Sequence, residues 1–249
     1  MSPVITFDPF ATMPFTGYID PVTGRQERYL SLAHFVHSER LSGVDERYRK
    51  YLLNLDDPEL FRLEVDGVGF TGGDRPDWEA LRPRLMYAGI FMQALSNREH
   101  YGQLIANAAQ LSIAHCSFSS DAALAMGQFI DDLQAPQDKL KVVFLGGCVD
   151  QDYVSSCLEV IFAKRSPQCL LALEDDGCAS GISAFARRHG SPFSMLSSSL
   201  SEQALAESIR LRCTHVFHFV GQNDSALNSG VVALLRNSGV TVSPIAPKP

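Results

Sequence analysis

Several features that would narrow the function are missing from this sequence of 249 residues. It has no Cys-x-x-Cys pair, no stripe of Lys or Arg, and no apolar run near the roughly 18 residues needed to span a bilayer. The formal net charge is −7, and the basic residues are scattered along the chain. We therefore expect neither a nucleic-acid partner nor a membrane partner.

The cysteines also lack the pattern of a disulfide framework. Disulfide-dense chains are short and secreted, whereas this chain is long and shows no signal peptide. We expect reduced, mostly buried thiols in the cytoplasm, or in a host cytoplasm or virion if a phage encodes the protein. We expect no cofactor and no metal. The six cysteines are Cys116, Cys148, Cys157, Cys169, Cys178 and Cys213.

The chain is long enough, and at 45% hydrophobic residues apolar enough, for one large or two modest domains. Residues 131–141 (DDLQAPQDKLK) are polar and contain Pro136, which disfavours helix at its own position and at the preceding one. We predict a first domain over residues 1–133 and a second over residues 139–249.

Short apolar runs alternate with amphipathic segments in the second half. Strands that are apolar on both faces and alternate with helices are typical of a parallel sheet covered on both sides. The sequence predicts an α/β, Rossmann-like, doubly wound parallel sheet of about five strands. Ser201 is expected to cap one helix and Gly190 to end another. The predicted strands lie at 141–147, 168–174, 192–198, 214–221 and 240–245.

The first half is less regular. An N-terminal strand and a hairpin around residues 20–24 (DPVTG) precede several segments of helical periodicity. We predict a helix-rich α+β domain, with helices at 30–41, 46–55, 77–96 and 98–111.

Loops of small residues follow three predicted strands. In an open parallel sheet, ligands bind beyond the carboxyl ends of the strands, where helix N-termini attract anions. Tight strand-to-helix turns are the alternative explanation for any single loop. The candidate ligand residues are Gly146, Gly147, Gly177, Ser180, Gly181, Ser229 and Gly230.

The second half also resembles a known superfamily. Residues 142–147 (VVFLGG), 176–190 (DGCASGISAFARRHG) and 225–245 (SALNSGVVALLRNSGVTVSPI) are similar to the Rossmann-like (LOG/DprA-like) nucleotide-binding proteins. These include the lysine-decarboxylase-like phosphoribohydrolases. The resemblance implies binding of nucleotide-type ligands. It departs from the hydrolytic members in lacking their PGGxGT loop, so we expect binding without base release.

The first half resembles the NADAR (YbiA-like) N-glycosidase family. Residues 28–43 (RYLSLAHFVHSERLSG), 74–95 (DRPDWEALRPRLMYAGIFMQAL) and 104–127 (LIANAAQLSIAHCSFSSDAALAMG) carry the similarity, which implies cleavage of ADP-ribose-type or riboflavin-pathway metabolites. Two departures matter. The glutamate before the histidine of the family motif is here Ala33. Asp121 is retained, but the late glutamate and tryptophan are missing. Because glycosidic cleavage needs a carboxylate, we expect a degenerate site.

Individual candidates remain open in this half. His34 and Asp121 are the candidate catalytic residues. No HExxH pattern is present, so His34 and His37 are expected to be polar side chains with satisfied hydrogen bonds rather than ligands of a metal. Trp78 is a core anchor or a stacking platform for a base. Arg75 is a phosphate contact or a solvated charge at a helix start.

The leading hypothesis is a two-domain protein that binds an ADP-ribose or nucleotide-type ligand and also a protein partner or a second copy of itself. The first alternative is a structural or assembly protein, such as one from a phage particle. The second is an active N-glycosidase with a relocated carboxylate, for instance Asp121 or Glu39.

Overall fold

The computed structural model describes residues 5–66, 73–116, 118–134, 140–221 and 224–246. Contacts group the chain into two compact units. Unit 1 comprises residues 1–17 and 26–136, and unit 2 comprises residues 18–25 and 137–249. The predicted boundary falls at residues 134–138, of which 135–138 lie outside the described residues, so the division into independent domains stays a prediction.

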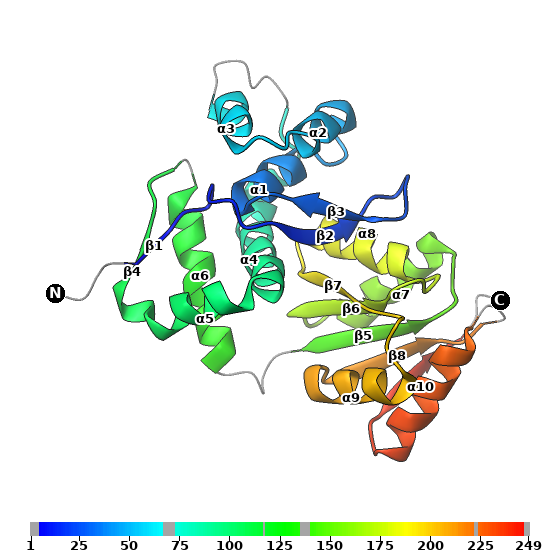
Figure 1. Cartoon of the computed structure of the whole chain (residues 1–249). Coiled ribbons are helices and arrows are strands. Elements are labelled where there is room, and N and C mark those ends of the chain that lie inside the picture. The colour runs from blue at the N-terminus through cyan, green and yellow to red at the C-terminus, as the bar shows by residue number, and fades with distance from the viewer. Residues whose placement is uncertain (1–4, 67–72, 117, 135–139, 222–223, 247–249) are drawn as a thin grey trace. The chain divides into compact units, whose positions relative to one another are not determined.

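Unit 1 is built around three helices that pack on one another (Figure 1). They are α1 (Leu32–Arg40), α4 (Trp78–Ser96) and α6 (Ser119–Gln134). Gly89 allows α1 and α4 to cross closely, because a Cβ atom there would lie 2.5 Å from Leu32 Cδ1 and 2.8 Å from Phe35 Cδ1. The smaller helices are α2 (Glu46–Leu53), α3 (Pro58–Asp66), α5 (Arg98–Ala106) and a 3-10 turn (Ala108–Gln110).

Two small sheets complete the N-terminal half. β1 (Ile5–Phe7) pairs in parallel with β4 (Leu111–Ile113), and β2 (Phe15–Ile19) pairs with β3 (Gln26–Tyr29), as the hairpin prediction required. The helix predicted to run to residue 111 is wrong at its end, because Leu111–Ile113 pair with β1 instead. The first part of the polar stretch 131–141 is helical, since α6 continues to Gln134.

Unit 2 contains a five-stranded parallel sheet in the order β7-β6-β5-β8-β9. Its central strands are almost completely buried, which fits a sheet with helices on both faces. The predicted parallel α/β sheet is thus confirmed. The strands are β5 (Lys141–Gly146), β6 (Cys169–Leu173), β7 (Phe193–Leu196), β8 (His215–Phe219) and β9 (Val242–Ile245).

Two pairs of helices cover the sheet. Figure 1 shows α7 (Gln151–Phe162) and α8 (Ala179–His189) over one face and α9 (Glu202–Arg212) and α10 (Ala226–Asn237) over the other. The hydroxyl of Ser201 accepts a hydrogen bond from the backbone N–H of Ala204 and so caps α9 as predicted. α8 ends at Gly190, which has the expected left-handed φ of 62°.

All six cysteines are free, in agreement with the prediction of reduced thiols. Only Cys169 and Cys178 are buried, so the expectation that most of them are buried is wrong. Cys116, Cys148, Cys157 and Cys213 are half-buried. Within the described ranges, no helix is long and apolar enough to cross a membrane.

Candidate functional site

The strand order of unit 2 defines where a ligand site is expected. The chain moves from β5 to β6 and β7 in one direction, and then places β8 and β9 on the other side of β5. In such sheets the helices on either side of the reversal diverge beyond the carboxyl ends of the strands, and ligands bind there. The loops after β5, β6 and β8 meet at this edge.

Asp176 connects these loops. Its Oδ2 accepts the backbone N–H of Gly146 at 2.9 Å, and its Oδ1 accepts the side-chain amide of Asn228 at 2.6 Å. Gly146 is the last residue of β5, and Asn228 lies in the first turn of α10. A single carboxylate therefore holds three segments that are far apart in the sequence.

Burial raises the pKa of Asp176 to about 6, and the negative charge of Asp224 acts in the same direction. The hydrogen bonds from Asn228 and from the Gly146 N–H oppose the rise, because they stabilise the ionised form. A carboxylate that titrates this close to neutrality at the edge of a parallel sheet is a candidate functional group.

A second polar pair lies beside Asp176. His218, the fourth residue of β8, is 7% exposed, and its Nε2 lies 2.6 Å from Oδ2 of Asp224. The side chain of Asp224 is 14% exposed. The geometry fits an imidazole N–H that donates to a carboxylate, which fixes the position of both side chains.

Two acceptor oxygens of this edge lack hydrogen bonds. Oδ1 of Asn228 and Oδ1 of Asp224 are buried, and neither has a partner among the described residues. Asn228 as a whole is completely buried. Because a buried acceptor without a partner costs free energy, both oxygens point to a hydrogen-bond donor outside the described residues.

The glycines predicted at this edge lie in the expected loops. Gly146 has φ 127°, and a Cβ atom there would lie 2.3 Å from the carbonyl oxygen of Phe219. A Cβ atom on Gly177 would lie 2.8 Å from the carbonyl oxygen of Gly147, so the structure brings these two predicted residues together. The chain itself occupies the space beside Gly146 and Gly177, which favours the close-packing explanation for both glycines.

The other predicted residues of unit 2 lie on helices. Ser180 and Gly181 are in the first turn of α8, and Ser229 and Gly230 are in α10. A Cβ atom on Gly181 would lie 2.9 Å from Val154, and one on Gly230 would lie 2.4 Å from the carboxyl group of Glu202. A bulky residue at Gly181 is therefore expected to disturb the packing of α7 on α8.

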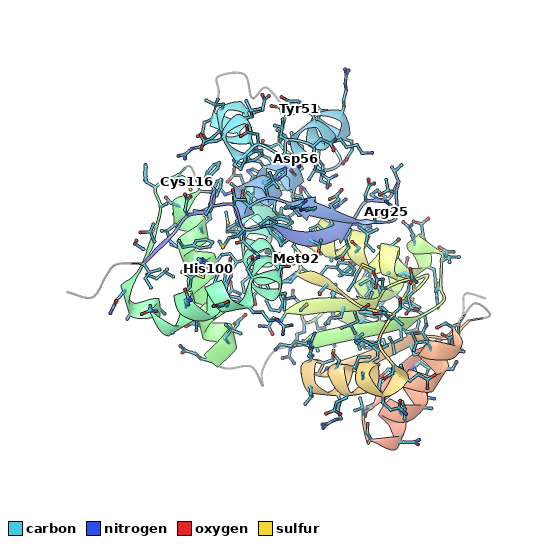
Figure 2. The ribbon with its side chains drawn as sticks, viewed as in Figure 1. Arg25, Tyr51, Asp56, Met92, His100 and Cys116 are labelled. Carbon is cyan, nitrogen blue, oxygen red and sulfur yellow. The ribbon has the colours of Figure 1, made fainter. Side chains whose placement is uncertain are left out.

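The predicted catalytic histidine of unit 1 is held entirely by the backbone. The N–H of Leu30 donates to Nδ1 of His34 at 3.0 Å, and Nε2 lies 2.8 Å from the carbonyl oxygen of Leu52. These partners require a neutral ring with its proton on Nε2. Burial lowers the pKa of His34, although the hydrogen bond with Leu52 and the negative charge of Asp56 act to raise it. Asp56 is labelled in Figure 2.

Asp121 is engaged elsewhere. Its carboxylate forms an ion pair with Nε of Arg82 at 2.9 Å, so the predicted catalytic residues His34 and Asp121 each have their own partners. Ala33 is completely buried, and its backbone N–H bonds to the carbonyl oxygen of Pro9. The position at which the resemblance predicts a glutamate thus carries only a buried methyl group.

The two remaining predictions concern the start of α4. Trp78 is 6% exposed, and the Arg40 guanidinium lies 6.0 Å from its ring, which fits a core anchor. Arg75 is 9% exposed and forms two hydrogen bonds to Asp77, at 2.6 and 3.1 Å. The bond from Arg75 lowers the pKa of Asp77.

A buried charge cluster that the sequence did not reveal lies between β3, α1 and α2. The Arg49 guanidinium pairs with Glu27 and Glu39, and the Tyr29 hydroxyl lies within hydrogen-bond distance of both carboxylates. Arg49 is 1% exposed and Glu39 is completely buried. Pairing that satisfies two buried carboxylates is typical of a structural network.

Asp176, Asn228, His218 and Asp224 were not among the predicted site residues. Within the described ranges, no group of three or more His, Cys, Asp or Glu side chains is arranged to hold a metal ion. No model of a known protein family matches the chain, and no curated protein matches it. Both family resemblances therefore remain predictions from the sequence.

Proposed function

We propose that unit 2 is a Rossmann-like module that binds a nucleotide-derived small molecule at the carboxyl edge of its sheet. One observation carries the proposal: Asn228, at the reversal of the strand order, holds a completely buried carbonyl oxygen that has no partner in the described part of the chain. The neighbouring carboxylates of Asp176 and Asp224 supply further acceptors. Hydroxyl-bearing ligands of the nucleotide type offer matching donors.

We further propose that unit 1 has lost glycosidase chemistry and supports the fold. The two carboxylates considered for relocation both have structural partners: Arg82 pairs with Asp121, and Arg49 pairs with the buried Glu39. Both ring nitrogens of His34 form hydrogen bonds with the backbone. Incubation with NAD-derived and ADP-ribosylated substrates is expected to release no base, and base release above the background of a buffer control would contradict this.

Binding by unit 2 can be tested with thermal unfolding of the full-length protein in the presence of nucleosides, nucleotides and ADP-ribose. A ligand at 100 times its Kd stabilises by about 2.7 kcal/mol, which raises Tm by a few degrees. We expect at least one compound to do so, and native mass spectrometry to detect the same complex. Asn228→Ala should abolish the shift, whereas Asn237→Ala, at the exposed end of the same helix, should preserve it. An equal shift in both variants would contradict the proposed site.

A second function is favoured by a different surface of unit 2. An open groove of about 450 Å³ lies beside α7, and its lining is mainly apolar. Val160 in this lining is 79% exposed. Such surfaces are typical of protein contacts, so a protein partner or a second copy of the chain is the candidate occupant. Its lining consists of Ser156, Cys157, Val160, Ile161, Phe217, Pro244 and Ile245.

Sedimentation velocity tests this second function. If the groove forms a contact between copies, the wild type should sediment as an oligomer at micromolar concentration, and Val160→Asp should sediment as a monomer. Val22→Asp, which also replaces an exposed valine but outside the groove, is the control. A monomeric wild type would leave contact with a different protein as the only form of this function.

A further inference from the structure

Part of one sheet face in unit 2 is not covered by any helix of the described residues. α7 and α8 lie over this face (Figure 1), but Phe217 of β8 and Ile245 of β9 line the open groove beside α7. A parallel sheet normally has helices over both faces, because its strands are apolar on both sides. The groove of about 450 Å³ is therefore a position at which an apolar surface of another molecule completes the packing.

The lining of the groove carries no charged side chain, and Val160 in it is 79% exposed. Ser156 is also exposed, but its hydroxyl donates to the carbonyl oxygen of Asp152 at 2.8 Å and so has a partner within α7. The Tyr153 hydroxyl donates to the carbonyl oxygen of Ala246, which joins α7 to the residue that follows β9. A molecule in the groove thus buries apolar area without leaving the Ser156 hydroxyl unpaired.

An exposed row of side chains beside the groove has opposite charges at its two ends. Residues at intervals of four lie along one side of a helix. Asp152 lies in the first turn of α7, and Lys164 lies two residues beyond its end. They are about 18 Å apart along the helix direction, which is too far for an ion pair within one chain. The row consists of Asp152, Ser156, Val160 and Lys164, all of them exposed.

This row is complementary to itself when two copies meet in antiparallel orientation. A two-fold axis at the level of residue 158 brings Asp152 of each copy opposite Lys164 of the other, and the small Ser156 opposite Val160. The carboxylate of Glu159, the other acidic residue of α7, pairs with side chains of α8 instead. We propose that two copies of the protein associate through antiparallel packing of α7, with Val160 of each copy against the groove of the other. This inference rests on the proposed contact function of the groove and names its occupant.

Charge reversal tests the pairing by analytical ultracentrifugation of the full-length protein at low ionic strength. Asp152→Lys and Lys164→Asp each place like charges opposite one another at two symmetric positions. Each single variant should raise the Kd of the dimer about tenfold or more. The double variant Asp152→Lys/Lys164→Asp again has opposite charges at both positions, so its Kd should lie within about threefold of the wild-type value.

The double variant separates pairing between copies from the stability of the helix. Asp152→Lys puts positive charge at the N-terminus of α7, and Lys164→Asp puts negative charge at its C-terminal end, so each weakens the helix and the double variant weakens it most. Rescue of the dimer therefore does not come from a more stable helix. Arg212→Asp, at the end of α9 over the other face of the sheet, is the control and should dimerise like the wild type.

The possible failures are distinguishable. A wild type that stays monomeric at micromolar concentration overturns the inference but leaves contact of the groove with a different protein standing. A monomeric Val160→Asp together with a double charge variant that is not rescued overturns the antiparallel pairing but keeps the groove as a contact. If folded Val160→Asp dimerises like the wild type, copies do not meet at the groove, and both the inference and the contact between copies through this surface fail.

Discussion

The side-chain nitrogen of Asn228 lies 2.6 Å from Oδ1 of Asp176 and donates a hydrogen bond to it. The bond joins the first turn of α10 to the loop after β6, across the position where the strand order reverses. Because the nitrogen donates to Asp176, the other amide atom, the buried acceptor Oδ1, faces away from that carboxylate. The hydrogen bond to Asp176 therefore fixes the orientation of the Asn228 side chain.

The raised pKa of Asp176 predicts a pH dependence of stability. Its folded-state pKa of about 6 exceeds the unfolded-state pKa of 3.8, so its stabilising contribution is complete below pH 3.8 and is lost as pH rises through 6. Relative to Asp176→Asn, which stays neutral, the wild type should lose about 1–2 kcal/mol between pH 4 and 7, allowing for partial solvent screening. Urea unfolding of both proteins across this range measures the difference, and a constant difference would contradict the raised pKa.

The lowered pKa of His37 predicts the opposite pH dependence of stability for unit 1. Burial lowers the pKa of His37 to about 4, with Arg40 and His34 acting in the same direction. Since the unfolded value is 6.5, stability is complete above pH 6.5 and is lost as pH falls toward 4. The wild type should lose up to about 3 kcal/mol over this range, and His37→Phe should lose less.

The exposed His100, labelled in Figure 2, supplies the control for this measurement. His100→Gln should keep the acid sensitivity of the wild type. The measurement is urea unfolding at several pH values between 4 and 7. The same acid sensitivity in His37→Phe as in the wild type would show that another group is responsible.

The buried cluster around Arg49 predicts a large loss of stability. Arg49→Met leaves Glu27 and Glu39 buried without their cation and should cost about 3–5 kcal/mol of unfolding free energy. Arg47→Met, at an exposed position of the same helix, should cost less than about 0.5 kcal/mol. Adding Glu27→Gln and Glu39→Gln to Arg49→Met should recover part of the loss. Equal chemical denaturation midpoints for Arg49→Met and the wild type would disprove the structural role of the cluster.

Ala33→Glu tests whether unit 1 keeps a pocket at the position of the missing family glutamate. Ala33 is completely buried in α1, so a glutamate there would be an unpaired buried carboxylate. We expect a loss of several kcal/mol, seen as a large fall in Tm. Ala80→Glu, at an exposed position of α4, should melt like the wild type. A shift of only a few degrees in Ala33→Glu would reveal a surviving cavity.

The strands and helices of unit 2 could be predicted because each strand is a short apolar run between amphipathic helices. Unit 1 was harder. β4 consists of only Leu111–Ile113 and exists through its pairing with β1, more than a hundred residues away in the sequence. Local periodicity contains no information about such a pairing.

The site was predicted only as a set of loops. Small size makes Gly146 and Gly177 candidates in the sequence, whereas the groups with unusual chemistry are their neighbours Asp176 and Asn228. His218 interrupts the apolar residues Val216, Phe217 and Phe219 close to the carboxyl end of β8, which is a usable signal for a functional side chain. The pairing of Asp176 with Asn228 depends on the sheet order, which a single sequence does not reveal.

The most direct test of ligand binding at the sheet edge is an NMR titration of the full-length protein labelled with ¹⁵N. If a nucleoside binds at this edge, saturating amounts should move the side-chain amide signal of Asn228 and the backbone amide signal of Gly146. The backbone amides of Leu30 and Ala33, which bond within unit 1, should stay unchanged. Signals that move in unit 1 while Asn228 and Gly146 stay fixed would contradict the account.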